Sequence, residues 1–207
     1  MVQEPMHLGI CIVDIEGFGR HPRNPTLVQM REVLYQTFHE GLCQASISEP
    51  ERVLKDLGDG ILALFAPQVP KPRLINPLVF RLVAALDAYN ATAGPGMRMR
   101  LRVVVHAGEI VRHSDEHVDE HVGVDLTHAF RLLGSTTAHQ RLAETEASLV
   151  LIVSQFFYEK VVAHGYPGID PGAFEPVRVT MKETKRARAW IWTPSRGDDV
   201  DPPSFAA

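Results

Sequence analysis

The chain is short of cysteine, of long apolar runs and of excess charge. Two cysteines in 207 residues are too few for a disulfide framework, so Cys11 and Cys43 are expected to be buried thiols in a reducing compartment. No apolar stretch approaches the roughly 20 residues of a membrane helix, and residues 1–7 do not resemble a signal peptide. A net charge of −4 without a basic block excludes nucleic acid and anionic membranes as obvious partners. These absences predict a cytoplasmic protein.

Apolar residues, in contrast, are plentiful. They make up 45% of the chain, which is enough for one hydrophobic core. We therefore expect a single domain over residues 1–193. Residues 194–207 are rich in aspartate and proline and are expected to be a disordered tail.

The periodicity of the apolar residues predicts the order of the elements. A near-continuous apolar run predicts a buried strand over 8–13, and Asn24-Pro25 begins a helix over 25–42. Further helices are expected from Asn76-Pro77, from near Asp125 and from Ser154. Further strands are expected over 52–57, 61–65, 99–105, 149–153, 177–181 and 189–192. This order predicts an α+β fold, a ferredoxin-like two-layer sandwich with helices packed on a mostly antiparallel sheet.

Two carboxylates follow or precede apolar runs at positions that suit a cation. Asp14 ends the first strand and leads into Ile15-Glu16-Gly17-Phe18-Gly19, and Asp59 lies between two glycines. Each alone is most simply a turn residue. Together, two strand-end carboxylates beside flexible backbone indicate a divalent metal that holds a polyphosphate.

The helix near Asp125 carries two polar residues on one side. Thr127 and Arg131 are four residues apart, so they share a face well round from the apolar stripe of Leu126, Ala129, Phe130 and Leu133. Alone, Arg131 would be read as a solvated residue. Shortly after Gly123, and with a polar residue one turn earlier, it can contact a ribose or a phosphate.

These segments, together with Leu57-Gly58-Asp59-Gly60-Ile61 and residues 101–109, resemble the catalytic domain of class III nucleotidyl cyclases over residues 7–193. The family contains adenylate and guanylate cyclases and bacterial pyrimidine nucleotide cyclases used in phage defence. The resemblance implies the class III cyclase fold and conversion of a nucleoside triphosphate to a cyclic nucleotide and pyrophosphate. Antiviral defence is a further role that the family's range allows.

The resemblance also implies a site. Asp14, Asp59 and the backbone of Ile15 would hold two divalent cations, Mg²⁺ or Mn²⁺. The loop Ile15, Glu16, Gly17, Phe18 and Gly19 would wrap the triphosphate. Arg131 and Lys182 would stabilise the transition state, while Lys55 and Glu120 would read the base. In this family one site draws on two domains, so a single-domain chain implies a homodimer with composite sites.

The pattern departs from the family at one position and leaves the base open. The family has an asparagine that orients the ribose where this chain has Thr127, a shorter side chain with one donor against two. A lysine that donates and a carboxylate that accepts suit adenine or cytosine, so Lys55 and Glu120 favour ATP or CTP over GTP or UTP.

Two alternatives stay open. Thr127 favours a degenerate domain that binds nucleotide or a partner protein without turnover. His113, His117 and His121 have a spacing that would suit zinc on a helix, although a solvated loop or hairpin is the preferred interpretation because the segment lacks an apolar stripe. His106, Ser154, Trp190 and Trp192 are expected to have structural roles, and residues 182–188 to form a charged hairpin.

Overall fold

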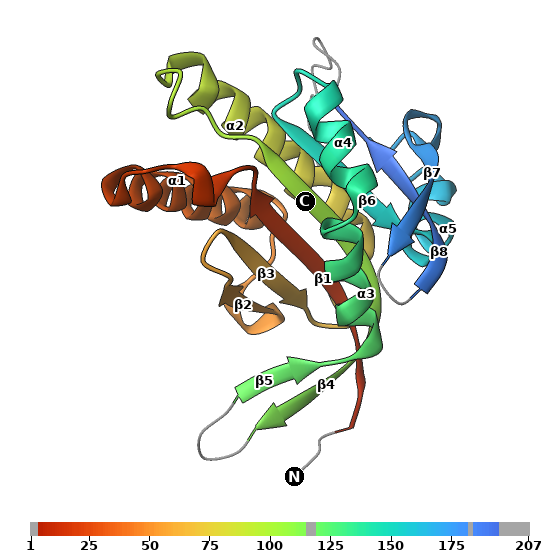
Figure 1. Cartoon of the computed structure of the whole chain (residues 1–207). Helices are drawn as coiled ribbons and strands as arrows, with labels where there is room; N and C mark the ends of the chain where they lie inside the picture. The colour runs from red at the N-terminus through yellow and green to blue at the C-terminus, as the bar shows by residue number, and fades with distance from the viewer. Residues whose placement is uncertain (1–3, 115–118, 182–183, 195–207) are drawn as a thin grey trace.

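The computed structural model describes residues 4–114, 119–181 and 184–194 (Figure 1). Its centre is a mixed sheet in the order β2-β3-β1-β4-β6-β8-β7, with β5 paired to the far part of β4. The pair β4–β6 is parallel and the other described pairs are antiparallel. The strands are β1 (Met6–Ile15), β2 (Arg52–Asp56), β3 (Gly60–Phe65), β4 (Leu101–Ser114), β5 (Asp119–Val122), β6 (Leu149–Ser154), β7 (Glu175–Met181) and β8 (Thr184–Trp192).

Helices cover both faces of this sheet. Side chains alternate along each strand, so β1 sends Cys11, Val13 and Ile15 into one core and Ile10 and Ile12 into the other. The first core is closed by α1 (Asn24–Gln44), α2 (Phe80–Thr92) and α5 (Gln155–Lys160), and the second by α3 (Val124–Leu133) and α4 (Thr136–Glu144).

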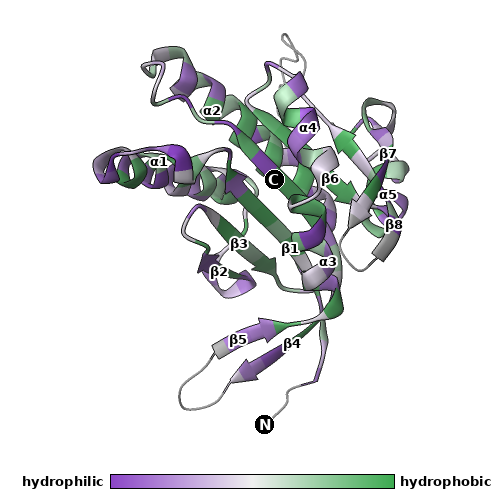
Figure 2. Cartoon of the chain, in the orientation of Figure 1, coloured by the Kyte–Doolittle hydropathy of each residue, from purple (hydrophilic) through white to green (hydrophobic). Residues whose placement is uncertain are grey.

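The arrangement confirms the predicted α+β fold, with helices on a mostly antiparallel sheet and the ferredoxin-like strand order β2-β3-β1-β4. Because α3 and α4 cover the second face, the sheet has helices on both sides and the domain has three layers where two were predicted. Figure 2 shows apolar colouring along β1, β4 and β6, and hydrophilic colouring on much of the β4–β5 hairpin that extends from the sheet. That hairpin confirms the preferred interpretation of the histidine-containing stretch, with His113 opposite Glu120. His117 lies outside the described residues.

Several local predictions were wrong. Cys43 is exposed, because it lies on the outer side of α1. Asn76 does not make the predicted cap hydrogen bond: its amide donates to the Pro167 carbonyl at 3.1 Å. The backbone of Asn76 is extended within the helical segment Ile75–Val79, which leads directly into α2 at Phe80. Helix α4 was missed, because its nine residues bury only Ala138 and Leu142 and so give a weak periodic signal.

Other local predictions were right. Cys11 is buried, and burial raises the pKa of its thiol to about 12. The Ser154 hydroxyl accepts from the Phe157 N–H at 3.1 Å and caps α5. Trp190 and Trp192 are buried packing residues. Within the described part of the chain, no helix combines the length and hydrophobicity needed to cross a bilayer.

Candidate active site

Asp14, near the end of β1, and Asp59, in the turn just before β3, lie at the same end of two neighbouring strands. The register pairs Asp14 of β1 with Gly60 of β3, and the Asp59 carbonyl accepts from the Ile15 N–H at 3.0 Å. Gly60 permits this approach, because a Cβ there would lie 2.1 Å from the Val13 carbonyl oxygen. The two carboxylates that the sequence places 45 residues apart therefore converge at one site.

A buried arginine faces the same site. Arg102, the β4 partner of Asp14, donates from Nε to the Asp14 carboxylate at 2.9 Å and forms an ion pair with it through a second nitrogen. The two side chains are only 11% and 12% exposed. The other side of the guanidinium contacts the ring of His139, which α4 brings to this end of the strands.

Burial and neighbouring charges act on the Asp14 carboxyl. Burial raises its pKa, the hydrogen bond from Arg102 opposes this, and the charge of Asp59 raises the pKa further. The effect of Asp59 indicates that two carboxylates lie near each other. Converging hard oxygen donors of this kind fit a divalent cation such as Mg²⁺ or Mn²⁺.

The number of protein ligands also suits Mg²⁺. The described residues contain no group of three or more His, Cys, Asp or Glu side chains placed to bind a metal. Mg²⁺ is commonly held by one or two carboxylates together with substrate phosphates rather than by an all-protein cage. The donor set of Asp14 and Asp59 therefore fits a cation that arrives with a phosphate-bearing substrate.

Fewer residues after β1 can present N–H groups to a phosphate than the prediction of residues 15–19 implied. The N–H groups of Ile15 and Glu16 donate to the carbonyls of Asp59 and Arg100, and the Glu16 carboxylate lies 3.5 Å from Arg100. This leaves residues 17–19 to present N–H groups to a phosphate. Gly17 has φ 69°, a left-handed conformation that glycine adopts without strain, where the chain turns into the short 3₁₀ helix Phe18–Arg20.

Helix α3 is anchored to β4 by a carboxylate in its first turn. Asp125 accepts from the Glu109 N–H at 2.7 Å, and its carboxylate covers Gly108 so closely that a Cβ there would lie 2.2 Å away. Gly123, which precedes the helix, is similarly confined, since its Cβ would lie 2.6 Å from the Glu109 carbonyl oxygen. The stretch 106–109 therefore positions α3.

The outer face of α3 carries the predicted ribose and phosphate residues. Thr127 is exposed and Arg131 half-buried, whereas Leu126, Ala129 and Leu132 are buried against the sheet. The Thr127 hydroxyl donates to the Gly123 carbonyl of its own helix at 3.1 Å. The anchor at Glu109 lies seven residues along β4 from Arg102, about 23 Å at the usual strand rise. Thr127, half a turn beyond the anchor, is thus well separated from Asp14 within one chain.

His106 is a buried partner of this anchor. One ring nitrogen is hydrogen-bonded to the Ser154 hydroxyl at 2.6 Å, and the other lies 3.6 Å from the Asp125 carboxylate. Desolvation lowers the pKa of His106 to about 4, with a further lowering by His128 and an opposing effect of Asp125. His106 is a hydrogen-bonded core residue, as predicted.

We expect this histidine to make stability depend on pH. An unfolded histidine binds its proton near pH 6.5, and folded His106 only near pH 4. Between these values the unfolded state holds more protons, so stability is full above pH 6.5 and decreases as the pH falls, by roughly 3 kcal/mol at most. Urea denaturation between pH 7.5 and 4.5 measures the loss. His106→Gln should show a shallower pH dependence than the wild type; equal slopes would contradict the assignment.

The predicted base-reading residues lie on two separate elements. Lys55 lies in β2, on the same face of that strand as Val53. A cavity of about 320 Å³ is bordered by Val53 and by Arg112 and His121 of the β4–β5 hairpin. Glu120, exposed on β5, alternates with His121 and points to the other side of the hairpin. Lys182 lies outside the described residues.

Sequence reasoning missed Arg102 and His139. Arg102 left a usable signal, namely one arginine within the apolar run 101–105, placed to face the same side of the sheet as Asp14. A buried charge in a central strand needs a partner. His139 left none, because its helix was not predicted and its contact with Arg102 depends on tertiary structure.

The fold of this chain is similar to that of solved cyclase structures, although its sequence matches no protein-family model and no curated protein. The guanylyl cyclase Cya2 superposes with a TM-score of 0.67 at 17% identity, over 96% of this chain and 98% of its own. An adenylate/guanylate cyclase/hydrolase from Silicibacter pomeroyi gives a TM-score of 0.64 at 18% identity, over 93% and 99% of the two chains. The chain has the nucleotidyl cyclase fold.

A third solved structure of this fold contains a nucleotide. It is the catalytic core of a rhodopsin-guanylyl cyclase with converted specificity, in complex with ATPαS, which superposes with a TM-score of 0.60 at 14% identity. It covers 93% of this chain and 98% of its own. The three cyclase structures thus superpose on this chain over nearly its whole length.

Proposed function

We propose that this chain is a nucleotidyl cyclase that converts a ribonucleoside triphosphate to a 3′,5′-cyclic nucleotide and pyrophosphate. The observation that carries the proposal is the convergence of Asp14, Asp59 and Arg102 at one end of the central strands of a cyclase-type sheet. Two carboxylates and a guanidinium there can accept both a divalent cation and a polyphosphate.

The reaction needs positioning and charge stabilisation rather than a covalent intermediate. Asp14, Asp59 and the Ile15 carbonyl would hold two divalent cations, which when bound neutralise the triphosphate and acidify the ribose 3′-hydroxyl. Arg102, which is now hydrogen-bonded to Asp14, would contact the phosphates instead when the cations occupy Asp14. Arg131 and Lys182 would stabilise negative charge on the phosphoryl oxygens as the 3′-oxygen attacks the α-phosphorus and pyrophosphate leaves.

The geometry of α3 supports a homodimer. Thr127 and Arg131 point away from the sheet that carries Asp14, and about 23 Å of strand separates the α3 anchor from Arg102. A nucleotide bound at Asp14 would therefore meet α3 of a second copy rather than its own. Two such sites per dimer, related by a twofold axis, would each combine residues from both chains.

The base remains the least constrained part of the substrate. Lys55 and Glu120 would donate to and accept from the base edge, which favours ATP or CTP. A pyrimidine product would also be consistent with a role in phage defence, as in the pyrimidine cyclases that the sequence resembles.

A substrate survey tests the proposal. The purified protein is incubated with Mg²⁺ or Mn²⁺ and each of the four ribonucleoside triphosphates, and cyclic monophosphate and pyrophosphate are measured by mass spectrometry. A cyclic product from ATP or CTP is expected. Absence of product with every nucleotide and metal would overturn the cyclase, and preference for GTP or UTP would overturn the Lys55 and Glu120 assignment alone.

One observation favours the alternative of a domain that binds nucleotide without turnover. The Thr127 hydroxyl is engaged with the Gly123 carbonyl at 3.1 Å, so it is not oriented toward a ribose. A substrate survey without product, together with measurable nucleotide binding, would support this alternative.

We expect Thr127→Asn to raise the rate of cyclisation. Asparagine is longer and carries two donors and an acceptor, and one additional hydrogen bond in the transition state corresponds to roughly tenfold in kcat/KM. Thr127→Val is the matched control, because valine keeps the shape but lacks the hydroxyl, and its kcat/KM should equal that of the wild type. A large loss in Thr127→Val would show that the threonine itself contacts the ribose.

A further inference from the structure

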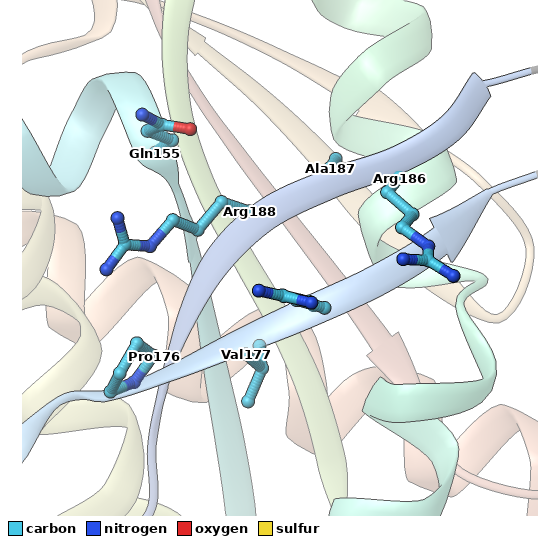
Figure 3. Close-up of a pocket in the computed structure, with 7 residues that line it drawn as sticks. Gln155, Pro176, Val177, Arg186, Ala187 and Arg188 are labelled. Carbon is cyan, nitrogen blue, oxygen red and sulfur yellow. The ribbon is translucent and has the colours of Figure 1, made fainter.

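A second group of arginines lies away from the candidate active site, on the β7–β8 hairpin. It borders a groove of about 570 Å³ in which Figure 3 shows Arg186 and Arg188 with Gln155 of α5. The groove is formed by Gln155, Pro176, Val177, Arg178, Arg186, Ala187 and Arg188.

The register of the hairpin places two of these arginines side by side. Arg178 of β7 and Arg188 of β8 are directly opposite partners, and Arg186 lies two residues from Arg188, on the same face of β8. Like charges directly opposite each other in an antiparallel pair are destabilising. An anion bound between the two guanidinium groups would remove this repulsion.

One of these guanidinium groups is held in place. The Arg188 guanidinium lies over the ring of Trp190, 4.7 Å from its centroid. The ring of Tyr158 also stacks on Trp190, nearly parallel to it, with the two ring centroids 4.2 Å apart. Stacking orients the plane of a guanidinium and leaves its N–H edges available to an anion. Less side-chain entropy is then lost when an anion binds.

The three arginines contrast with a neighbour of the same type. Arg141 of α4 forms an ion pair with Glu175 at the start of β7, whereas Arg178, Arg186 and Arg188 form no ion pair with any residue that the structure describes. The carboxylate of Glu159 accepts from the Gln155 amide at 2.7 Å. Because the three arginines have no ion pair among the described residues, the groove concentrates positive charge.

We propose that this groove is an anion site for an oligophosphate group, separate from the site at Asp14. The Cα atoms of directly paired strand residues are about 5 Å apart and those of alternate residues about 7 Å apart, so three long arginine side chains start from one small area of the hairpin and can reach the same multiply charged anion. Arginine binds phosphate oxygens in a bidentate manner. An extended acidic peptide presents its charges over a longer distance and fits less well.

The two sites lie on opposite faces of the sheet. Arg188 shares a strand face with Trp190, which packs into the core formed with α1, α2 and α5. Asp14 shares a face with Ile12, which packs into the core formed with α3 and α4. The alternation of side chains therefore prevents one ligand from contacting both sites in the same chain.

The aromatic stack supplies a local readout. Trp190 and Trp192 are the only tryptophans in the chain, and both lie on β8. Sodium pyrophosphate is titrated into the full-length protein in the presence of a metal chelator at low ionic strength, and tryptophan fluorescence is recorded. A saturable change is expected in the wild type. The double variant Arg178→Gln/Arg188→Gln should weaken the apparent affinity at least tenfold.

Arg141→Gln is the matched control, since it removes the same charge nearby but leaves the groove intact, and its affinity should stay within twofold of wild type. Thermal melts check folding, and the stability of the double variant should stay close to that of the wild type, because removal of the like-charge pair offsets the lost stacking of Arg188 on Trp190. Unchanged affinity in the double variant, or the same fluorescence change with sodium chloride at equal ionic strength, would overturn the proposal. No turnover is measured, so the result is independent of the proposed cyclase activity.

Discussion

Asp59→Ala should abolish cyclic nucleotide formation without unfolding the protein. Its carboxylate is exposed at the turn before β3 and has a charge interaction with Asp14, so its removal takes away a metal ligand and no packing. We expect a loss of at least about 100-fold in kcat, because removal of groups that merely orient ligands already costs 10- to 100-fold. The melting temperature should stay unchanged. Asp87→Ala, an exposed carboxylate on α2, is the control and should retain full activity.

Asp14→Ala should lose both activity and stability. The Arg102 side chain is 11% exposed and donates to Asp14, so the variant leaves a buried guanidinium without its carboxylate. Breaking a buried ion pair in this way costs about 3–5 kcal/mol. Urea denaturation should therefore separate Asp14→Ala from Asp59→Ala, although both are inactive.

The double variant Asp14→Ala/Arg102→Ala completes the comparison. It should recover part of the stability lost in Asp14→Ala, because no charge is left buried and unpaired, and it should stay inactive. Equal stability of the two single aspartate variants would contradict the buried pair. Full activity of Asp59→Ala would contradict its assignment as a metal ligand.

Gly60→Ala should disrupt the site through the backbone. The added Cβ would lie 2.1 Å from the Val13 carbonyl oxygen and 3.2 Å from the Asp14 Cα, so β3 would have to move away from β1. Overpacking against rigid backbone typically costs up to about 3 kcal/mol and sometimes more. The displacement would also separate Asp59 from Asp14. We therefore expect both a lower melting temperature and a loss of cyclisation.

Gly94→Ala is the matched control for this experiment. A Cβ at Gly94 would meet no atom within 4 Å, so the same substitution there should leave stability and activity near wild type. Differential scanning calorimetry and the cyclisation assay measure the two effects. A Gly60→Ala variant with wild-type stability would show that β1 and β3 need not approach so closely.

Much of the fold could be predicted from the sequence because its signals are local. The apolar run in β1, the helical stripe of Met30, Leu34, Phe38 and Leu42 in α1, and the strands β3 and β6 are all strongly periodic or continuous. Elements with weak signals were lost or misplaced. Helix α4 buries only two residues, and the π-helical segment Ile75–Val79 delays the start of α2.

The residues of the candidate site also differ in whether a local sequence pattern indicates them. Asp14 and Asp59 could be found because each carboxylate lies at one end of an apolar run close to glycine, a pattern visible in a few residues. Arg102 could be suspected as a charge within an apolar strand, but its partners Asp14 and His139 could not be assigned, because these contacts join β1, β4 and α4. Such contacts depend on strand order and register, which no local pattern encodes.

The sequence by itself determined strands such as β1, β3 and β6 and the helix α1, and it indicated Asp14 and Asp59 as candidate ligands, since burial, turn formation and helix periodicity act within a few residues. Only the tertiary structure decided how they meet. It joined Asp14 to Arg102 through strand register, anchored α3 through Asp125, and placed Arg178 against Arg188 on the opposite face of the sheet. The reason is that the pairing of distant strands is fixed by the packing of the whole core.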